Sequence, residues 1–266
     1  MKKIIYLAVF SIMALFSSCN KSREIDYENL IVGKWLCTSI NEEAVITDNA
    51  FVIEFCSNKV QKLAKGYALS DGNKRWMEGV NYSYRLEDNI LFINGRDALD
   101  SIWTLELEIT IINEQSLTYG VRKITMGGKN MTDKNIYKFS KITNDNSSKI
   151  VGLWYGKDVT SATTDNAYHY WEYLADGTFY YYYFDIENNV WIKKGDNNGR
   201  YYTYGNFMAT NYSNDIASGQ QKDTYECWSI TISGNIMHWT GRRADNQLVK
   251  FSMERTSTPV PGFEKQ

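Results

Sequence analysis

The chain has almost no proline. Its only two prolines, Pro259 and Pro261, lie close to the C-terminus of 266 residues. Every residue before them keeps the backbone N–H group that a sheet ladder needs, so proline excludes no strand from the body of the chain. Histidine is equally scarce, with only His169 and His238. No Cys-x-x-Cys, His-x-His or His-Glu-x-x-His spacing occurs, so the sequence predicts neither a metal site nor another cofactor.

Catalytic fingerprints and a strong charge of one sign are missing too. We find no Gly-x-Ser-x-Gly, P-loop or dinucleotide-binding pattern, and we therefore expect no enzyme. The formal net charge is −2 and the isoelectric point is about 5.8. A chain of this balance lacks the basic surface that nucleic acids require, so we expect no nucleic-acid partner.

Aromatic residues are plentiful. They make up 15% of the chain, with 20 Tyr and 8 Trp, while hydrophobic residues reach 43% and charged residues 23%. This composition is typical of folded domains rather than disordered segments. Aromatic rings pack well on pleated surfaces, which favours strands, and the length leaves room for roughly two domains.

The N-terminus has the features of an export signal. Two lysines precede an apolar run from Ile4 to Phe16, and a Ser-Ser-Cys sequence ends at Cys19. The run is too short to span a bilayer and is typical of a secretory signal peptide. The small-small-Cys ending resembles the lipobox of bacterial lipoproteins, which implies cleavage after residue 18 and lipidation of Cys19 with diacylglycerol and an N-acyl chain such as palmitate. The alternative is an ordinary cleaved signal with a chance cysteine.

Acyl chains on Cys19 would anchor the protein to a lipid bilayer. Asn20 follows the cysteine, rather than the aspartate that resembles an inner-membrane retention signal, so we expect the outer membrane. Whether the body faces the periplasm or the cell exterior stays open at this stage.

The body of the chain is an internal duplication. IVGKW at 31–35 returns as IVGLW at 150–154. Four more correspondences follow in the same order: FVIEF (51–55) with YHYWEY (168–173), NYSYRLEDNILFI (81–93) with RYYTYGNFMAT (200–210), ITIINEQSLTYGVR (109–122) with ITISGNIMHWTGR (230–242), and YKFSK (137–141) with VKFSM (249–253). A polar joint, TNDNSSK at 143–149, separates the two copies.

The sequence of each copy predicts about eight short strands. Asp176-Gly177, Asp88-Asn89 and Ser233-Gly234-Asn235 are turn signals between apolar runs. We find no convincing long amphipathic helix. The best candidate lies around Val60–Ala68, and 61–81 looks like an insertion in the first copy. Many short strands without proline predict a sandwich or a closed barrel.

The Gly-x-Trp at the start of each copy, with the Asp-Gly-Thr-Phe at 176–179, resembles the signature of lipocalin-like (calycin) barrels. The resemblance covers 150–256 and, more loosely, 31–143, where CSNKV at 56–60 replaces the Asp-Gly hairpin. It implies an all-β protein with two tandem lipocalin-like antiparallel β-barrels after a cleaved lipoprotein signal peptide. The expected order is signal peptide 1–18, lipidated tether 19–27, first domain 28–143, second domain 144–258 and tail 259–266.

Strand alternation assigns side chains to the barrel interior. We expect the following inside: Phe51, Ile53, Phe55, His169, Trp171, Tyr173, Phe179, Tyr181, Tyr183, Tyr202, Tyr204, Trp228, Ile230, Ile232, Met237, Trp239, Phe251 and Met253. The same rule places His238 outside. The resemblance further implies that Trp35 and Trp154 plug the barrel ends as structural residues, each covered by a basic side chain from the last strand. Parity indicates Arg255 for Trp154 and Lys141 for Trp35.

The sequence does not predict a clear disulfide bond. Besides Cys19 there are three, an odd number that cannot all pair within one chain. Parity places Cys37 inside, and Cys56 and Cys227 outside. We expect free thiols, with a Cys37–Cys56 bridge disfavoured.

Tyrosines and tryptophans of the second copy are the candidates for ligand binding: Trp171, Tyr173, Tyr181, Tyr183, Tyr202, Tyr204 and Trp239. They could stack on a small apolar, aromatic or glycan ligand. In the alternative to ligand binding, the inward rings only fill a narrow barrel, and the outward rings of 178–194 pack on the sister domain. Two hypotheses follow: a non-catalytic, membrane-anchored ligand-binding lipoprotein, or a structural or inhibitory module that contacts a protein partner.

Overall fold

The computed structural model describes residues 25–45, 50–68, 74–96, 100–160, 168–193, 199–215, 221–242, 248–256 and 263–264. The expected signal peptide, Cys19 and the two prolines lie outside these ranges. Among the described residues, no helix has the length and apolar character needed to cross a membrane.

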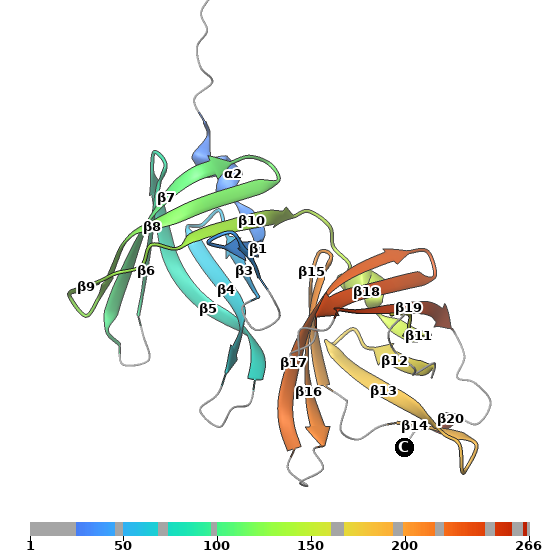
Figure 1. Cartoon of the computed structure of the whole chain (residues 1–266). Coiled ribbons are helices and arrows are strands. Elements are labelled where there is room, and N and C mark those ends of the chain that lie inside the picture. The colour runs from blue at the N-terminus through green and yellow to red at the C-terminus, as the bar shows by residue number, and fades with distance from the viewer. Residues whose placement is uncertain are drawn as a thin grey trace, which may run out of the picture.

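The first copy forms a closed antiparallel barrel (Figure 1). Eight of the described strands close the ring, because β10 pairs with both β1 and β8. In ring order they are β1 (Gly33–Ile40), β3 (Phe51–Phe55), β4 (Val60–Ala68), β5 (Lys74–Glu87), β6 (Ile90–Arg96), β7 (Ile102–Ile112), β8 (Ser116–Met126) and β10 (Ile136–Ile142). Two short strands are added outside the ring, β2 (Glu43–Ala44) on β1 and β9 (Lys129–Met131) on β8.

The second copy closes in the same way, through the pairing of β12 with β13. Its ring consists of β11 (Gly152–Asp158), β12 (His169–Tyr173), β13 (Thr178–Asp185), β15 (Gly199–Tyr204), β16 (Phe207–Asp215), β17 (Gln221–Ser233), β18 (Ile236–Arg242) and β19 (Leu248–Thr256). Outside the ring, β14 (Val190–Lys193) pairs with β13, and β20 (Phe263–Glu264) pairs with β14. The predicted all-β class with two tandem antiparallel barrels is confirmed.

The duplication is visible strand by strand. A short helix precedes each barrel, α2 (Tyr27–Ile31) and α3 (Ser147–Ile150). The five sequence correspondences fall on equivalent strands: β1 with β11, β3 with β12, the β5–β6 hairpin with β15–β16, β7–β8 with β17–β18, and β10 with β19. The turn signals also hold, with Asp88 at φ 52° and Gly234 at φ 57° between paired strands.

Each barrel is filled by one apolar core. The first core is built around Ile31, Trp35, Cys37, Ile53, Phe55, Tyr84, Leu91, Ile93, Leu107, Ile109, Leu117, Tyr119 and Phe139. The second contains Ile150, Trp154, Trp171, Tyr173, Phe179, Tyr201, Met208, Trp228, Ile230, Met237, Trp239, Val249, Phe251 and Met253. These side chains alternate with outward ones along the strands, as the period of two requires.

The stretch around Val60–Ala68, the best candidate for a helix, is not a helix. This stretch is strand β4, which pairs with β3 on one side and β5 on the other. Leu63 packs on the barrel core, whereas the next residue, Ala64, is buried outside the barrel against the second copy. Both faces of β4 are thus covered, so its apolar residues do not show the simple alternation of a half-exposed strand. The presumed insertion forms much of the β4–β5 hairpin.

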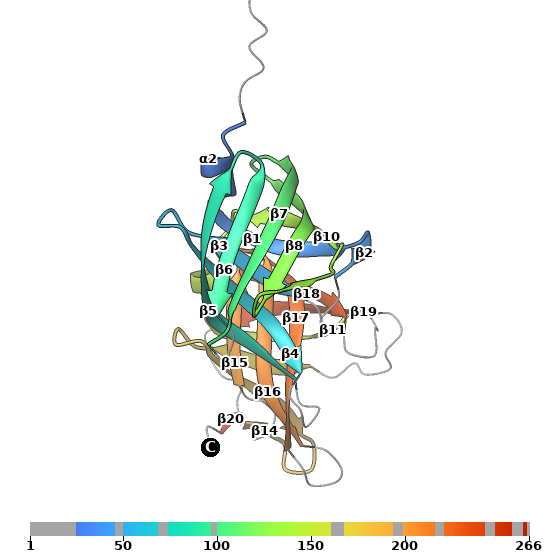
Figure 2. The ribbon, with the colours of Figure 1, turned by 90° about the vertical axis from the view of Figure 1, so that its left-hand side faces the viewer.

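The two barrels contact each other through the outer faces of their strands (Figures 1 and 2). The interface has its own buried cluster, to which the first barrel contributes Ala50, Val52, Ala64 and Trp76, and the second contributes Tyr204, Phe207, Ala209, Tyr225 and Cys227. Figure 2 views β4 and β5 in front of β16 and β17. The long β4–β5 hairpin therefore ties one barrel to the next.

Candidate functional site

A tryptophan closes the helix end of each barrel. The indole N–H of Trp35 donates to the carbonyl of Ile31 at 2.7 Å, and that of Trp154 donates to the carbonyl of Ile150 at the same distance. Both rings are completely buried. Each hydrogen bond satisfies an end carbonyl of the short helix, which would otherwise be left without a partner.

The basic side chains assigned by parity lie over these rings. The guanidinium carbon of Arg255 is 4.2 Å from the centroid of the Trp154 ring, and Lys141 Nζ is 5.0 Å from that of Trp35. Both also donate to helix-end carbonyls: Lys141 to Leu30 at 3.1 Å, Arg255 to residue 151 at 2.5 Å. Burial lowers the pKa of Lys141.

The glycine of each Gly-x-Trp is required by the cation above it. Gly33 and Gly152 have φ of 129° and 132°, a region that side chains rarely adopt. A Cβ atom on Gly152 would lie 2.4 Å from Arg255 Nη1, and one on Gly33 would lie 2.8 Å from Lys141 Cε. Glycine, tryptophan and cation therefore form one structural unit, repeated in each barrel.

Three of the expected binding residues lie in the core of the second barrel. Trp171, Tyr173 and Trp239 are at most 7% exposed, and their rings interlock, with centroids 5.2 Å apart for Trp171 and Trp239 and 6.1 Å for Tyr173 and Trp239. Tyr181 packs at the edge of this core, with its hydroxyl 2.8 Å from His169 Nδ1. Tyr183 is half-buried and belongs to no core. These rings therefore pack against one another inside the barrel and do not form the wall of a binding site.

Two buried polar atoms in this core, Tyr173 Oη and Trp239 Nε1, have no hydrogen-bond partner among the described residues. Burial raises the pKa of the Tyr173 phenol well above its usual value, so the group is neutral. The core therefore offers a ligand neither a charge nor a reactive group.

The inward assignment of Tyr202 and Tyr204 is wrong. In strand β15 it is Tyr201 that joins the core, and its hydroxyl donates to the carbonyl of Leu174 at 2.7 Å. Tyr202 and Tyr204 point outward to the inter-barrel cluster. Both faces of β15 are covered, one by the core and one by the first barrel, so tyrosines occur on both and the sequence alternation does not identify the inner one.

Polar contacts hold the inter-barrel interface in register. The side chain of Asn211 pairs with the backbone of Trp76, accepting from its N–H at 2.6 Å and donating to its carbonyl at 2.8 Å. The hydroxyl of Tyr204 donates to the carboxylate of Glu78. Burial, and then this hydrogen bond, raises the pKa of Tyr204. No local sequence pattern predicts these contacts, because they join residues 126 to 135 positions apart.

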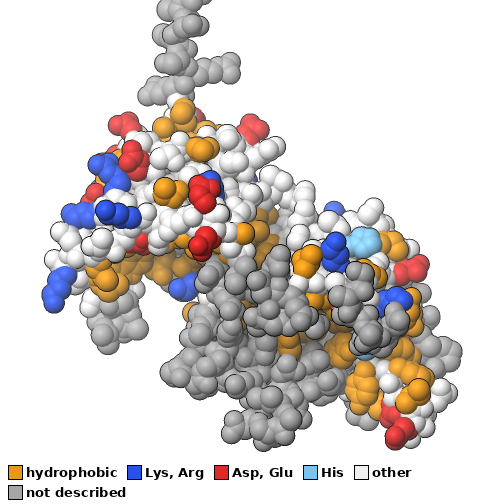
Figure 3. Space-filling model, in the orientation of Figure 1, with side chains coloured by type: hydrophobic (Ala, Val, Ile, Leu, Met, Phe, Trp, Pro, Cys, Tyr) orange, Lys and Arg blue, Asp and Glu red, His pale blue; other side chains and the backbone are white. Residues whose placement is uncertain are grey.

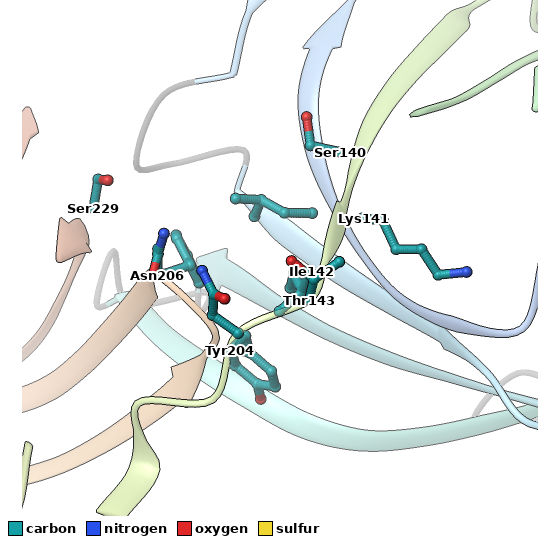
Figure 4. Close-up of a pocket in the computed structure, with 10 residues that line it drawn as sticks. Ser140, Lys141, Ile142, Thr143, Tyr204, Asn206 and Ser229 are labelled. Atoms are coloured by element: carbon teal, nitrogen blue, oxygen red, sulfur yellow. The ribbon is translucent and has the colours of Figure 1, made fainter. Parts of the chain in front are cut away.

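A crevice opens beside this interface, where the chain passes from one barrel to the other (Figure 4). Its volume is about 220 Å³. Both barrels and the joint contribute to its lining, which consists of Leu36, Ser140, Lys141, Ile142, Thr143, Asn144, Tyr204, Asn206, Phe207 and Ser229. We call it the inter-barrel crevice.

A buried asparagine of the joint fixes one wall of the crevice. Asn146 is 4% exposed, and its amide donates to the carbonyl of Gly205 at 2.8 Å and to Asn206 Oδ1 at 3.1 Å. The carboxamide oxygen of Asn206 is thereby turned toward the joint. Lys141 points away from the crevice, toward its contacts at the end of the first barrel (Figure 4).

A second aromatic cluster covers the outside of the second barrel. Tyr155, Tyr170 and Trp191 are in contact there, with Tyr170 and Trp191 centroids 4.6 Å apart and Tyr155 and Tyr170 4.5 Å apart. The row continues to Tyr168 and Phe184, which are 43% and 42% exposed. Hydrophobic side chains gather over this part of the barrel in Figure 3. We call this set the outer aromatic row.

This row corrects the idea that the outward rings of 178–194 pack on the sister domain. The outward residue Tyr182 belongs to the same outer cluster as Tyr170 and Trp191, and its hydroxyl donates to Glu172 at 2.7 Å. The sister barrel is instead contacted by strands β15, β16 and β17.

The three described cysteines are free thiols. Cys37 is buried in the first core, where burial raises the pKa of its thiol to about 12. Cys227 lies in the inter-barrel cluster, and Cys56 is half-buried. A thiol with so high a pKa is a poor nucleophile at neutral pH.

His238 is exposed, as expected. In the part of the chain that the structure describes, no three His, Cys, Asp or Glu side chains are grouped so that they could hold a metal ion.

The fold thus defines a protein of two tandem closed antiparallel barrels joined by a packed interface. No protein-family model and no curated protein matches the chain. Among solved structures, a double mutant of the vaccine antigen transferrin binding protein B from Haemophilus parasuis is similar over 80% of this chain and 55% of that chain. Its identity is 9% and its TM-score is 0.25, values too low to support an inference.

Proposed function

We propose that this protein is an outer-membrane lipoprotein with two lipocalin-like barrels and no catalytic activity, which binds its ligand on its outer surface. One observation carries the proposal: the interlocked rings of Trp171, Tyr173 and Trp239 occupy the barrel interior in which a lipocalin-like protein would hold a ligand. An eight-stranded barrel is only just wide enough for its own side chains. We therefore place ligand binding on the outer surface that the two barrels form together.

The anchor is supported by the N-terminal sequence. Ser-Ser-Cys after a 13-residue apolar run, Ile4 to Phe16, places Cys19 at the acylated position. Two acyl chains suffice for stable attachment to a bilayer. The descriptions as lipoprotein and as outer-membrane protein both rest on this segment.

Protein recognition is the second candidate function, and the outer aromatic row favours it. Tyr168 and Phe184 expose over 40% of their surfaces at the two ends of a packed series of rings. Exposed aromatic residues are enriched at protein interfaces.

The position of binding is tested with a long-chain fatty acid and with the dye anilinonaphthalene sulfonate. The intact barrels should bind neither. Trp239→Ala removes a buried ring, so this variant should gain dye binding in the new cavity while the unfolding free energy falls by about 3–5 kcal/mol. Stoichiometric binding of the fatty acid by the unaltered protein would refute surface binding.

The anchor is tested by metabolic labelling with an alkyne fatty acid. The label should enter the unaltered protein but not Cys19→Ser, which should also leave the membrane fraction. Equal labelling of the two proteins would remove the anchor from the proposal.

A further inference from the structure

We infer that the inter-barrel crevice binds one uncharged pyranose unit, either as a free sugar or as a unit of a neutral polysaccharide. This inference rests on the proposed function, since it names the ligand class for a surface site.

The crevice is a preformed site. Its two walls come from different barrels, which are fixed relative to each other by the Trp76–Asn211 pair and by Asn146. Sites between packed units are common places for small ligands, and walls that are already ordered reduce the entropy lost on binding. A ligand held here would touch both barrels at once.

The lining carries no charge toward the crevice. Lys141 is the one ionisable side chain of the lining other than the phenol of Tyr204, and its ammonium is engaged with the carbonyl of Leu30 and the ring of Trp35. The exposed Lys34 lies outside the lining, 5.8 Å from the centroid of the Tyr204 ring. Phosphates and other strong anions prefer several converging cations or backbone donors, so this lining favours an uncharged ligand.

Short neutral hydrogen-bonding groups surround the opening. Ser140, Thr143 and Ser229 supply hydroxyls, which both donate and accept, and none of these three hydroxyls has a hydrogen bond to another described residue. Asn144 and Asn206 add carboxamides. Because the oxygen of Asn206 already accepts from Asn146, its NH₂ group is left to donate.

Apolar side chains complete the lining. Leu36, Ile142 and Phe207 lie between the polar groups, and Figure 4 shows Ser140 and Ser229 on opposite sides. A pyranose has this same division, with C–H groups on its faces and hydroxyls around its rim. A purely apolar ligand would leave the amides and hydroxyls without partners, which costs free energy.

Size sets the length of the ligand. The volume of the crevice is about 220 Å³. Pockets for drug-sized ligands measure about 300–1,000 Å³. The crevice is therefore of a size that suits a single ring.

The test uses saturation-transfer NMR on the soluble chain that begins after Cys19. The probes are methyl glycosides of glucose, galactose and mannose, with methyl glucuronide as a charged probe of the same size. Dextran, a neutral polysaccharide, distinguishes the second source of the ligand from the free sugars. At least one neutral probe should bind, and methyl glucuronide should bind more weakly than methyl glucoside.

Two variants on one strand locate the site. Ser229→Trp places a large ring in the crevice and should weaken binding at least tenfold. Thr231→Trp adds the same ring two residues along the same exposed face of β17, outside the lining, and should bind as the unaltered protein does. Unchanged melting curves would show that both variants are folded.

Two results would overturn the inference: no neutral probe binds, or Ser229→Trp and Thr231→Trp bind equally well. Neither result would contradict the proposed function, in which surface binding fails if an apolar ligand occupies a barrel interior. Such binding would respond to Trp239→Ala and not to Ser229→Trp.

Discussion

Trp154 and Arg255 show how one residue pair can close a barrel. The indole is fully buried with its N–H bonded to the helix end, and the guanidinium covers the ring at 4.2 Å. The ring supplies most of the stabilisation, because burial of a large aromatic group outweighs a cation–π contact of about 1–2 kcal/mol. Gly152 leaves the space that the cation needs.

Substitution of the pair should therefore give a graded loss. Trp154→Ala should lower the unfolding free energy by about 3–5 kcal/mol, and Arg255→Ala by about 1 kcal/mol. Arg255→Lys should lose less than Arg255→Ala, because Lys141 makes the equivalent contact in the first barrel. Urea unfolding of the soluble chain measures all three, with Tyr168→Ala as an exposed aromatic control. An unchanged midpoint for Trp154→Ala would contradict the role of the ring.

Strand faces could be predicted from the sequence at several strands of both barrels. Strand β12 is an example: parity placed Trp171 and Tyr173 inside, and the structure agrees. Prediction failed at β4 and β15, two elements with outward residues that pack against the other barrel. There the apolar residues respond to two environments, and the second, the neighbouring barrel, follows from tertiary contacts that no local pattern encodes.

The same reason explains what could be predicted of the candidate site. The Gly-x-Trp units and their cations lie on strands whose ends carry a repeated motif. The inter-barrel crevice instead depends on Asn146, Asn206 and Ser229, polar residues without a motif that approach each other only when both barrels are packed. Its residues were accordingly absent from the sequence-based candidates, apart from Tyr204 and Lys141.

Gly66 marks a close approach between two elements of different barrels. A Cβ atom at this position would lie 2.3 Å from the ring and hydroxyl of Tyr225, a buried residue of β17. Gly66→Ala must therefore displace the ring or separate the barrels, and overpacking of this kind costs about 1–3 kcal/mol. Urea unfolding followed by tryptophan fluorescence should report the loss.

A double-mutant cycle with Tyr225→Ala isolates the contact. Gly66→Ala should cost clearly less in that background, because the ring it strikes is gone. Gly120→Ala is the matched control within the first barrel: its new Cβ would have no neighbour closer than 3.9 Å, so stability should be unchanged or slightly higher. Equal costs of Gly66→Ala with and without Tyr225 would show that the clash does not exist.

At the scale of the whole molecule, the question is how far the two barrels depend on each other. Each has its own core and its own closing Gly-x-Trp unit, which favours independent folding. Their contact nevertheless buries Trp76 almost completely, between Tyr204 and Phe207 on one side and the outer face of its own barrel on the other. Separation would expose this cluster to water.

A fragment of residues 144–258 should fold alone as a β protein with a cooperative melt, yet self-associate through the exposed face that includes Phe207 and Tyr225. Phe207→Thr tests whether that face causes the self-association, because the substitution should be unfavourable in the full chain and favourable in the fragment. In the full soluble chain the ring packs 5.5 Å from Trp76, and its loss should cost about 3 kcal/mol. In the fragment the same substitution should reduce self-association, measured by sedimentation, with little effect on the melt. A fragment with a random-coil circular dichroism spectrum would mean that the second barrel requires the first in order to fold. A fragment that stays monomeric with Phe207 in place would mean that the interface is too polar to drive association.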